Sequence, residues 1–209
     1  RILSVRTNKE IMMRANEFDE DDIMLPIKEL PYCVNSTVHN EIIIPIDEVV
    51  QEASYYRNAA HAISMATEGD VVRFKINSPG GRLDGLVALL HAVGGTSAAV
   101  VAEIVGECHS AASILALHCD EIFVGPYASM LCHSVRYGYV GKSADVEAHV
   151  KHASKTTEKL MRETYIGFLS EEEIEDLLKG RELYLDSTEI IERLKDREGL
   201  FNSLENDLD

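Results

Sequence analysis

The sequence lacks any hydrophobic run long enough to span a membrane. Its most apolar stretches, VALLHAVGG (87–95) and ASILALHC (112–119), are too short and both contain histidine. The chain begins at Arg1 without a basic and apolar leader, so we expect no secretory signal and a cytoplasmic location. Internal repeats, low-complexity tracts and linkers are also missing, which argues against division into several domains.

Basic residues are scarce. The chain has 20 lysines and arginines against 36 aspartates and glutamates, a formal net charge of −16 at pH 7. This charge repels phosphate backbones and argues against a nucleic-acid partner, and with no long apolar run we expect no membrane partner either. The excess of carboxylates is interpreted as a solvated acidic surface.

Cysteine is also sparse, with four residues at positions 33, 108, 119 and 132. Without an export signal they are expected to be reduced thiols and not a disulfide framework. Three of them stand next to a histidine, which raises a zinc hypothesis. However, no pair of cysteines has knuckle spacing, and neighbouring side chains diverge on a helix or strand. We therefore expect no metal site and no cofactor.

From residue 40 onward, strand patterns alternate with helix patterns. Strands are predicted at 40–46, 69–78, 97–106, 121–126 and 129–135, and helices at 47–67, 83–93, 110–119, 142–168 and 170–180, before a last strand or turn and helix over 182–196. This alternation predicts an α/β domain of parallel βαβ units. The expected division is an N-terminal arm (1–39), the main domain (40–200) and a C-terminal tail (201–209).

Ser110 is the first candidate for chemistry. It follows the apolar strand VVAEIVG and opens a helix of small residues, so its hydroxyl points out of a tight turn. The N–H of Ala111 then lies at a helix N-terminus, where negative charge is favoured. This is the arrangement of a nucleophile with one donor of an oxyanion hole. Ser113 lies one turn deeper and is expected to pack against the sheet.

A second oxyanion donor could come from SPGG (78–81), where Gly81 would direct its N–H at the same oxygen; taken alone, Pro-Gly-Gly is only a turn. His133 is the best candidate for a general base, because it ends a later strand of the sheet. His109 is adjacent to Ser110, so the two side chains point apart. The remaining helical histidines are expected to be surface or packing residues: His61, His91, His149 and His152.

Three blocks in chain order, INSPGG (76–81), GECHSAAS (106–113) and MLCH (130–133), resemble the proteolytic subunit of the Clp protease (ClpP). The resemblance runs from about Asn40 to Asp196. It implies a ClpP/crotonase-like fold of repeated β-β-α units with a protruding handle helix, which residues 142–168 would form. It assigns Ser110 as the nucleophile, His133 as the general base, and the amides of Gly81 and Ala111 as the oxyanion hole.

The resemblance further implies a serine endopeptidase that cleaves unfolded or short polypeptides. Leu83, Val135 and Arg136 would border the peptide, which is added as a strand. The assembly implied is a homo-oligomer of stacked rings of seven subunits around a closed chamber, fed by an AAA+ unfoldase.

The sequence departs from the family at the third member of the triad, because the expected aspartate position is Leu178. Asp176 and Glu182 lie close by, and either could orient His133. GRELYLDSTEI (180–190) is more similar to phage-type ClpP-like proteases. Three alternatives therefore stay open: a catalytically weakened or inactive ring subunit, a capsid-processing protease, and a crotonase-type enzyme acting on acyl-thioesters.

Overall fold

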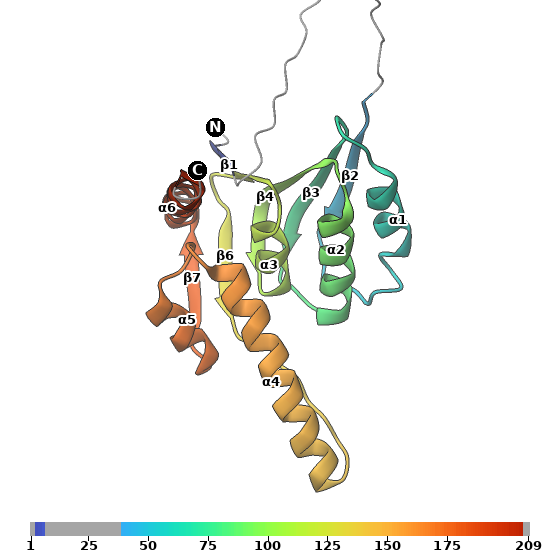
Figure 1. Ribbon diagram of the computed structural model, residues 1–209, viewed down its shortest axis with the longest axis vertical. Helices are drawn as coiled ribbons and strands as arrows, with labels where there is room; N and C mark the ends of the chain where they lie inside the picture. Colours follow the sequence, from blue (N-terminus) through green and yellow to red (C-terminus); the bar gives the residue numbers. More distant parts are fainter. Residues whose placement is uncertain (1–2, 7–38, 207–209) are drawn as a thin grey trace, which may run out of the picture.

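The structure, a computed structural model, describes residues 3–6 and 39–206 of the chain. The described part is a mixed α/β fold with one seven-stranded sheet and six helices (Figure 1). The strands are β1 (Leu3–Arg6), β2 (Glu41–Ile46), β3 (Val71–Ser78), β4 (Ala99–His109), β5 (Glu121–Val124), β6 (Ser129–His133) and β7 (Glu182–Asp186). The helices are α1 (Arg57–Met65), α2 (Leu83–Gly95), α3 (Ala111–Leu117), α4 (Ser143–Tyr165), α5 (Glu171–Leu178) and α6 (Ser187–Asn206).

Parallel pairing dominates the sheet, as the alternating pattern predicts. The main path runs β1-β5-β4-β3-β2, and all neighbours from β5 to β2 are parallel, while β1 joins β5 in antiparallel fashion. The long strand β4 pairs with β5 through its first half and with β6 through its second half. Strand β7 then joins β6 antiparallel. The C-terminal ends of β3, β4 and β6 therefore meet in one region.

Helices α1, α2 and α3 lie on one face of the sheet (Figure 1). The core between these layers is built from the inward positions of each strand, such as Val72, Phe74 and Ile76 on β3, with Leu86 and Leu89 on α2. Helix α3 consists of small and aliphatic residues, all of them buried, which lets it pack closely against the sheet.

Helix α1 is shorter than expected. The apolar spacing predicts a helix over 47–67, but the structure begins it at Arg57. The cause is tertiary: Val50 donates its N–H to Gly80 O (2.8 Å) and accepts from Arg82 N (2.8 Å). Its backbone groups are thus paired with the Pro-Gly-Gly turn and are not free for a helical ladder. At the other end of the chain, α6 extends to Asn206, into the segment expected to be a tail.

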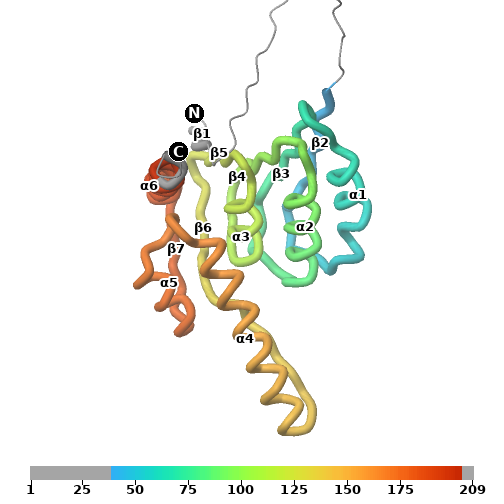
Figure 2. The backbone as a smooth tube through the Cα atoms, in the orientation of Figure 1, coloured from blue at the N-terminus to red at the C-terminus, as the bar shows by residue number. Residues whose placement is uncertain are grey.

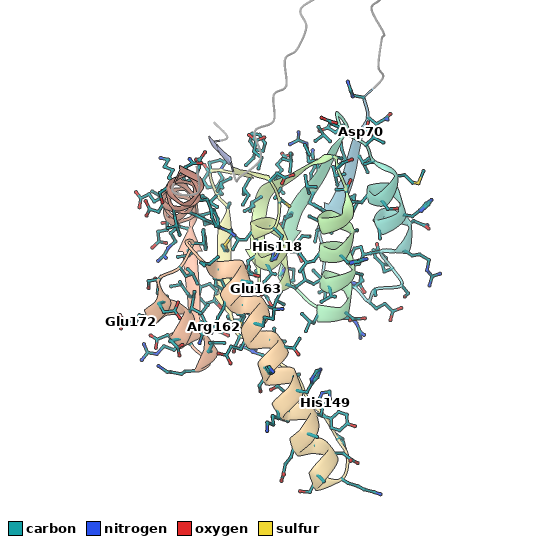
Figure 3. The ribbon with its side chains drawn as sticks, in the orientation of Figure 1. Asp70, His118, His149, Arg162, Glu163 and Glu172 are labelled. Atoms are coloured by element: carbon teal, nitrogen blue, oxygen red, sulfur yellow. The ribbon has the colours of Figure 1, made fainter. Side chains whose placement is uncertain are left out.

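Helix α4 extends well beyond the rest of the molecule (Figure 2). Its C-terminal part is tied to α5 by Arg162, which forms ion pairs with Glu171 (2.7 Å) and Glu175 (2.5 Å). His149 lies on the projecting part (Figure 3), stacked on Tyr139 of the preceding loop at 4.2 Å between ring centroids. In the described residues, the length and apolar character needed to cross a bilayer are not combined in any helix.

Candidate active site

Ser110 has an unusual backbone conformation at the start of α3. It is the N-cap residue of the helix, with φ 56° and ψ −121°, and it alone among the described non-glycine residues has a positive φ. Such a conformation costs about 1–3 kcal/mol and persists only where the surroundings impose it. Here Ser110 N donates to Leu131 O of β6 (2.8 Å), so the turn is anchored to the neighbouring strand. The side chain is half-buried and reaches the surface of the turn.

The Pro-Gly-Gly turn lies directly against this serine. A β-carbon added to Gly80 would stand 2.6 Å from Ser110 Cβ and 2.5 Å from His109 O, and the φ of Gly80 is +88°. Only glycine therefore permits this approach. The turn is held by buried Ser78, whose hydroxyl accepts from Gly80 N (3.1 Å) and donates to Glu48 O (2.5 Å). The two motifs that the sequence separates by about thirty residues are thus in contact.

An irregularity in the pairing of β3 with β4 brings the Pro-Gly-Gly turn to Ser110. Ile76 pairs with Ile104, but Ser78 pairs with Cys108, so β4 gains residues relative to β3. Asn77 fills the irregularity by accepting a hydrogen bond from Glu107 N (3.0 Å). The bulge shifts the end of β3 along β4 until the glycines reach Ser110.

The two predicted main-chain donors are in the serine turn and in the glycine turn that contacts it through Gly80. The N–H of Ala111 is at the first position of α3, where no intrahelical acceptor exists, and the N–H of Gly81 is in the adjoining turn. In the part of the chain that the structure describes, neither N–H donates a hydrogen bond. Both are therefore free to bind an anionic oxygen, as an oxyanion hole requires.

His133 is the last residue of β6, two positions beyond Leu131, whose carbonyl accepts from Ser110 N. Because β6 runs parallel to β4, both strands end beside the mouth of α3. His133 alternates with buried Met130 and Cys132 and is itself half-buried, so its ring lies on the face away from the core. The structure thus brings the ends of the serine and histidine strands together.

The other histidines are arranged differently. His109 Nε2 lies 3.0 Å from Ser129 Oγ, and its ring packs edge-on against Tyr184. The four helical histidines, expected to be surface or packing residues, are all exposed: His61, His91, His149 and His152.

Three positions concern the acidic residue that would be the third member of the triad. Leu178 ends α5 and lines a cavity of about 210 Å³ with Ser134 and Val135, the two residues after His133. The carboxylate of Asp176 is bound by Arg181 (2.7 Å). Glu182 lies directly opposite His133 in the antiparallel pairing of β6 and β7. Of the two carboxylates, Glu182 is therefore the one that shares a face of the sheet with the histidine.

The residues expected to border a peptide lie around the same region. Leu83 begins α2 and is half-buried, and Val135 lines the cavity beside Leu178. Arg136 is exposed and forms an ion pair with Glu182.

Cys108, Cys119 and Cys132 are buried in the core and, in the described residues, are not joined by a disulfide. Burial raises the pKa of the Cys132 thiol to about 12, so it is protonated at neutral pH. In the described residues, no group of three histidine, cysteine or acidic side chains is arranged to hold a metal ion. The fourth cysteine, Cys33, lies outside the described residues.

Several residues of the site escape sequence reasoning. Gly80 contacts the serine turn, and the Pro-Gly-Gly motif could have indicated it. Ser113 was expected to pack against the sheet and is fully buried, but its hydroxyl also binds the Ser110 carbonyl (2.7 Å). Tyr165 contacts Ser113 from 52 residues away, and no local pattern indicates that contact.

The arrangement combines a strained serine at a helix mouth, two free main-chain donors, and a histidine on the neighbouring strand. Such a set can carry out acyl transfer through a covalent intermediate. A family model described as Clp protease matches residues 28–193. A search of curated proteins finds no match to this chain.

Proposed function

Because the chain belongs to the Clp protease family, we propose that it is a serine endopeptidase of the ClpP type that acts on unfolded or short polypeptides. The observation that supports this most is the contact between Gly80 and the strained Ser110 turn, with two free amides beside it. A structural turn would not need a serine in a disfavoured conformation at the N-terminus of a buried helix.

In the proposed reaction, Ser110 Oγ attacks the carbonyl carbon of the scissile peptide bond and gives its proton to His133. The negative oxygen of the tetrahedral intermediate accepts hydrogen bonds from the N–H groups of Gly81 and Ala111. His133 then protonates the leaving amine, and the acyl group stays on Ser110. Water hydrolyses this ester with His133 as the base, which regenerates the serine.

We infer that Glu182 orients His133 in place of the aspartate that Leu178 replaces. Directly opposed residues on antiparallel strands have β-carbons about 5 Å apart, within reach of a carboxylate and a ring. The ion pair of Glu182 with exposed Arg136 is at the surface and weak, so it leaves the carboxylate available. Asp176 is less suitable because it lies on α5 and not on the strand that pairs with β6.

The family also supports an oligomeric assembly. We propose that α4 is the handle by which rings of this chain join, that the rings enclose the active sites in a chamber, and that an AAA+ unfoldase supplies the substrate. In this arrangement the ClpP/crotonase-like fold supplies the site, and Leu83, Val135 and Arg136 border the bound peptide.

A second candidate is a non-catalytic ring subunit, which the leucine at position 178 favours. Losing the third member of a serine triad lowers the rate by about 10⁴-fold. If Glu182 does not take over that role, the chain would contribute structure and little hydrolysis.

Labelling with a fluorophosphonate probe distinguishes the two. We expect the probe to modify Ser110 in the full chain, and Ser110→Ala and His133→Ala to abolish this modification. Ser64→Ala, an exposed serine on α1, is the matched control and should be labelled like the wild type. Absence of labelling in a folded wild-type protein would favour the non-catalytic role.

A further inference from the structure

Two buried hydroxyls lie beneath the candidate nucleophile. Ser113 on α3 and Tyr165 at the end of α4 are both fully buried. Ser113 Oγ lies 2.7 Å from Ser110 O and 3.0 Å from Tyr165 OH. The chain Tyr165–Ser113–Ser110 therefore connects the last turn of α4 to the strained residue of the site.

The number of protons fixes the direction of this chain. A serine hydroxyl has one proton, and that of Ser113 is donated to the Ser110 carbonyl. At the second contact Ser113 Oγ must then accept, so Tyr165 is the donor. Each hydroxyl thus donates toward Ser110, and aligned hydrogen bonds of this kind strengthen one another in a buried environment.

Cys132 extends the cluster toward the histidine. Burial raises the pKa of its thiol, the hydroxyls of Tyr165 and Ser113 partly offset that rise, and Cys132 immediately precedes His133 on β6. Burial raises the pKa of the Tyr165 hydroxyl well above its usual value, so this group keeps its proton. The cluster therefore lies between the carbonyl of Ser110 and the strand that ends in His133.

We propose that Tyr165 is a positioning residue, which acts through Ser113 to hold Ser110 in the backbone conformation that the reaction needs. Tyr165 does not touch the substrate. It fixes the rotamer of Ser113, and Ser113 fixes the carbonyl whose orientation sets the ψ of Ser110 and the direction of the Ala111 N–H. This inference rests on the proposed function and adds a residue that has no place in the triad.

The test compares Tyr165→Phe, which keeps the ring and removes the hydroxyl, with Ser113→Ala. For each variant we would measure the second-order rate of fluorophosphonate labelling, and kcat and KM on a short peptide ester. We expect at least a tenfold loss in labelling rate and in kcat for both variants, with KM within twofold of the wild type. If these hydroxyls served folding alone, the variants would have a lower melting temperature, but kcat would not fall selectively while KM stayed the same.

Thr164→Val is the matched control. Thr164 is fully buried beside Tyr165, and in the described part of the chain its hydroxyl has no hydrogen-bond partner. We expect this variant to react at the wild-type rate. The double variant Ser113→Ala/Tyr165→Phe should react no more slowly than Ser113→Ala, since both changes interrupt one chain.

The outcomes separate this inference from the function on which it rests. If wild-type Ser110 is labelled and Tyr165→Phe is labelled equally fast, the positioning role is overturned while the peptidase proposal stands. Multiplicative losses in the double variant, or a loss in Thr164→Val as large as in Tyr165→Phe, would also overturn it. If the wild type is not labelled, the peptidase proposal fails first. Should Tyr165→Phe not fold, Ser113→Ala decides alone by the same criterion.

Discussion

At the scale of single residues, Ser110 is held against its own conformational preference. Its carbonyl accepts hydrogen bonds from Ser113 N (3.0 Å), Ile114 N (3.3 Å) and Ser113 Oγ (2.7 Å). Its N–H is bound to β6, and Gly80 closes the other side. These contacts offset a strain of about 1–3 kcal/mol, and among the described residues the Ser110 hydroxyl makes no hydrogen bond of its own. The result is a serine presented at a helix N-terminus.

The carboxylate that orients His133 can be identified by substitution at the residue scale. We expect Glu182→Gln to lower kcat for peptide-ester hydrolysis at least tenfold, because the amide cannot stabilise the imidazolium that forms during the reaction. Steady-state kinetics on the purified full chain would measure this.

Asp176→Asn is the control for that substitution, since it removes a carboxylate of the same neighbourhood that is bound to Arg181. Its kcat should stay within twofold of the wild type. A loss confined to Asp176→Asn would assign the role to Asp176 instead. Unchanged kcat in both variants would mean that His133 works without an acid partner.

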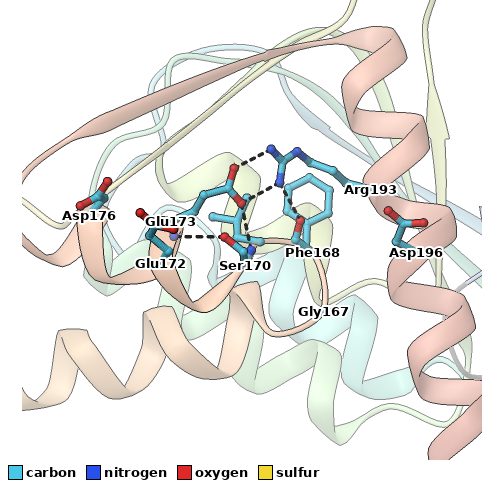
Figure 4. Close-up of a pocket in the computed structure, with 9 residues that line it drawn as sticks. Gly167, Phe168, Ser170, Glu172, Glu173, Asp176, Arg193 and Asp196 are labelled. Carbon is cyan, nitrogen blue, oxygen red and sulfur yellow. Dashed lines mark hydrogen bonds and ion pairs between the residues drawn. The ribbon is translucent and has the colours of Figure 1, made fainter.

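At the scale of elements, α5 and α6 are joined at the N-terminus of α5. Ser170 caps that helix by accepting from Glu173 N (3.2 Å), and the Glu173 carboxylate accepts a hydrogen bond from Ser170 N (2.9 Å). The same carboxylate binds Arg193 of α6 through both oxygens, at 2.7 and 2.9 Å (Figure 4). A single glutamate therefore completes a capping box and links two helices.

The stability that this glutamate supplies should depend on pH. Hydrogen bonds from Arg193 lower the pKa of Glu173 to about 2, against 4.5 for an unperturbed glutamate. A carboxyl whose pKa is lower in the folded state stabilises the fold above pH 4.5, and this stabilisation is lost as the pH falls from 4.5 toward 2. We expect Glu173→Gln to lower the free energy of unfolding by about 1–2 kcal/mol at pH 7 and by progressively less below pH 4.5.

Urea unfolding of wild type and Glu173→Gln at several pH values would measure that difference. Glu172→Gln is the control, because Glu172 precedes Glu173 on the same turn and forms no ion pair in the described residues. It should change stability little at any of these pH values. A difference for Glu173→Gln that stays constant down to pH 3 would contradict the assignment.

At the scale of the whole molecule, packing within the chain does not explain why helix α4 projects from the body. Part of it packs on the body through Met161 and Tyr165, while its first half extends away with Val150 partly exposed. An exposed apolar residue on a projecting helix is suited to an interface between subunits.

We therefore expect the 23.2 kDa chain to sediment as a double ring. Val150→Asp should reduce the sedimenting mass to that of one ring, because a buried unpaired charge weakens the apolar contact between the rings. Analytical ultracentrifugation measures both. Val150→Thr, similar in shape and uncharged, is the control and should keep most of the assembly. A wild-type chain that sediments as a monomer would contradict the assembly proposal.

The sequence by itself determined the features that depend on local order. Hydrophobic spacing predicts the parallel α/β arrangement, and the motif order places Ser110 at the start of a helix of small residues. These predictions succeed because periodicity, caps and glycine turns act within a few residues of one another.

Only the tertiary structure decided which distant groups meet. It delayed the start of the helix expected over 47–67 until Arg57 by pairing Val50 with the glycine turn, and it placed Glu182 opposite His133 and Tyr165 beneath Ser113. These contacts depend on sheet register, on a bulge at Asn77 and on helix packing. The local spacing of residues in the sequence does not indicate these long-range contacts. A shift of one residue in the strand register changes which side chains share a face of the sheet.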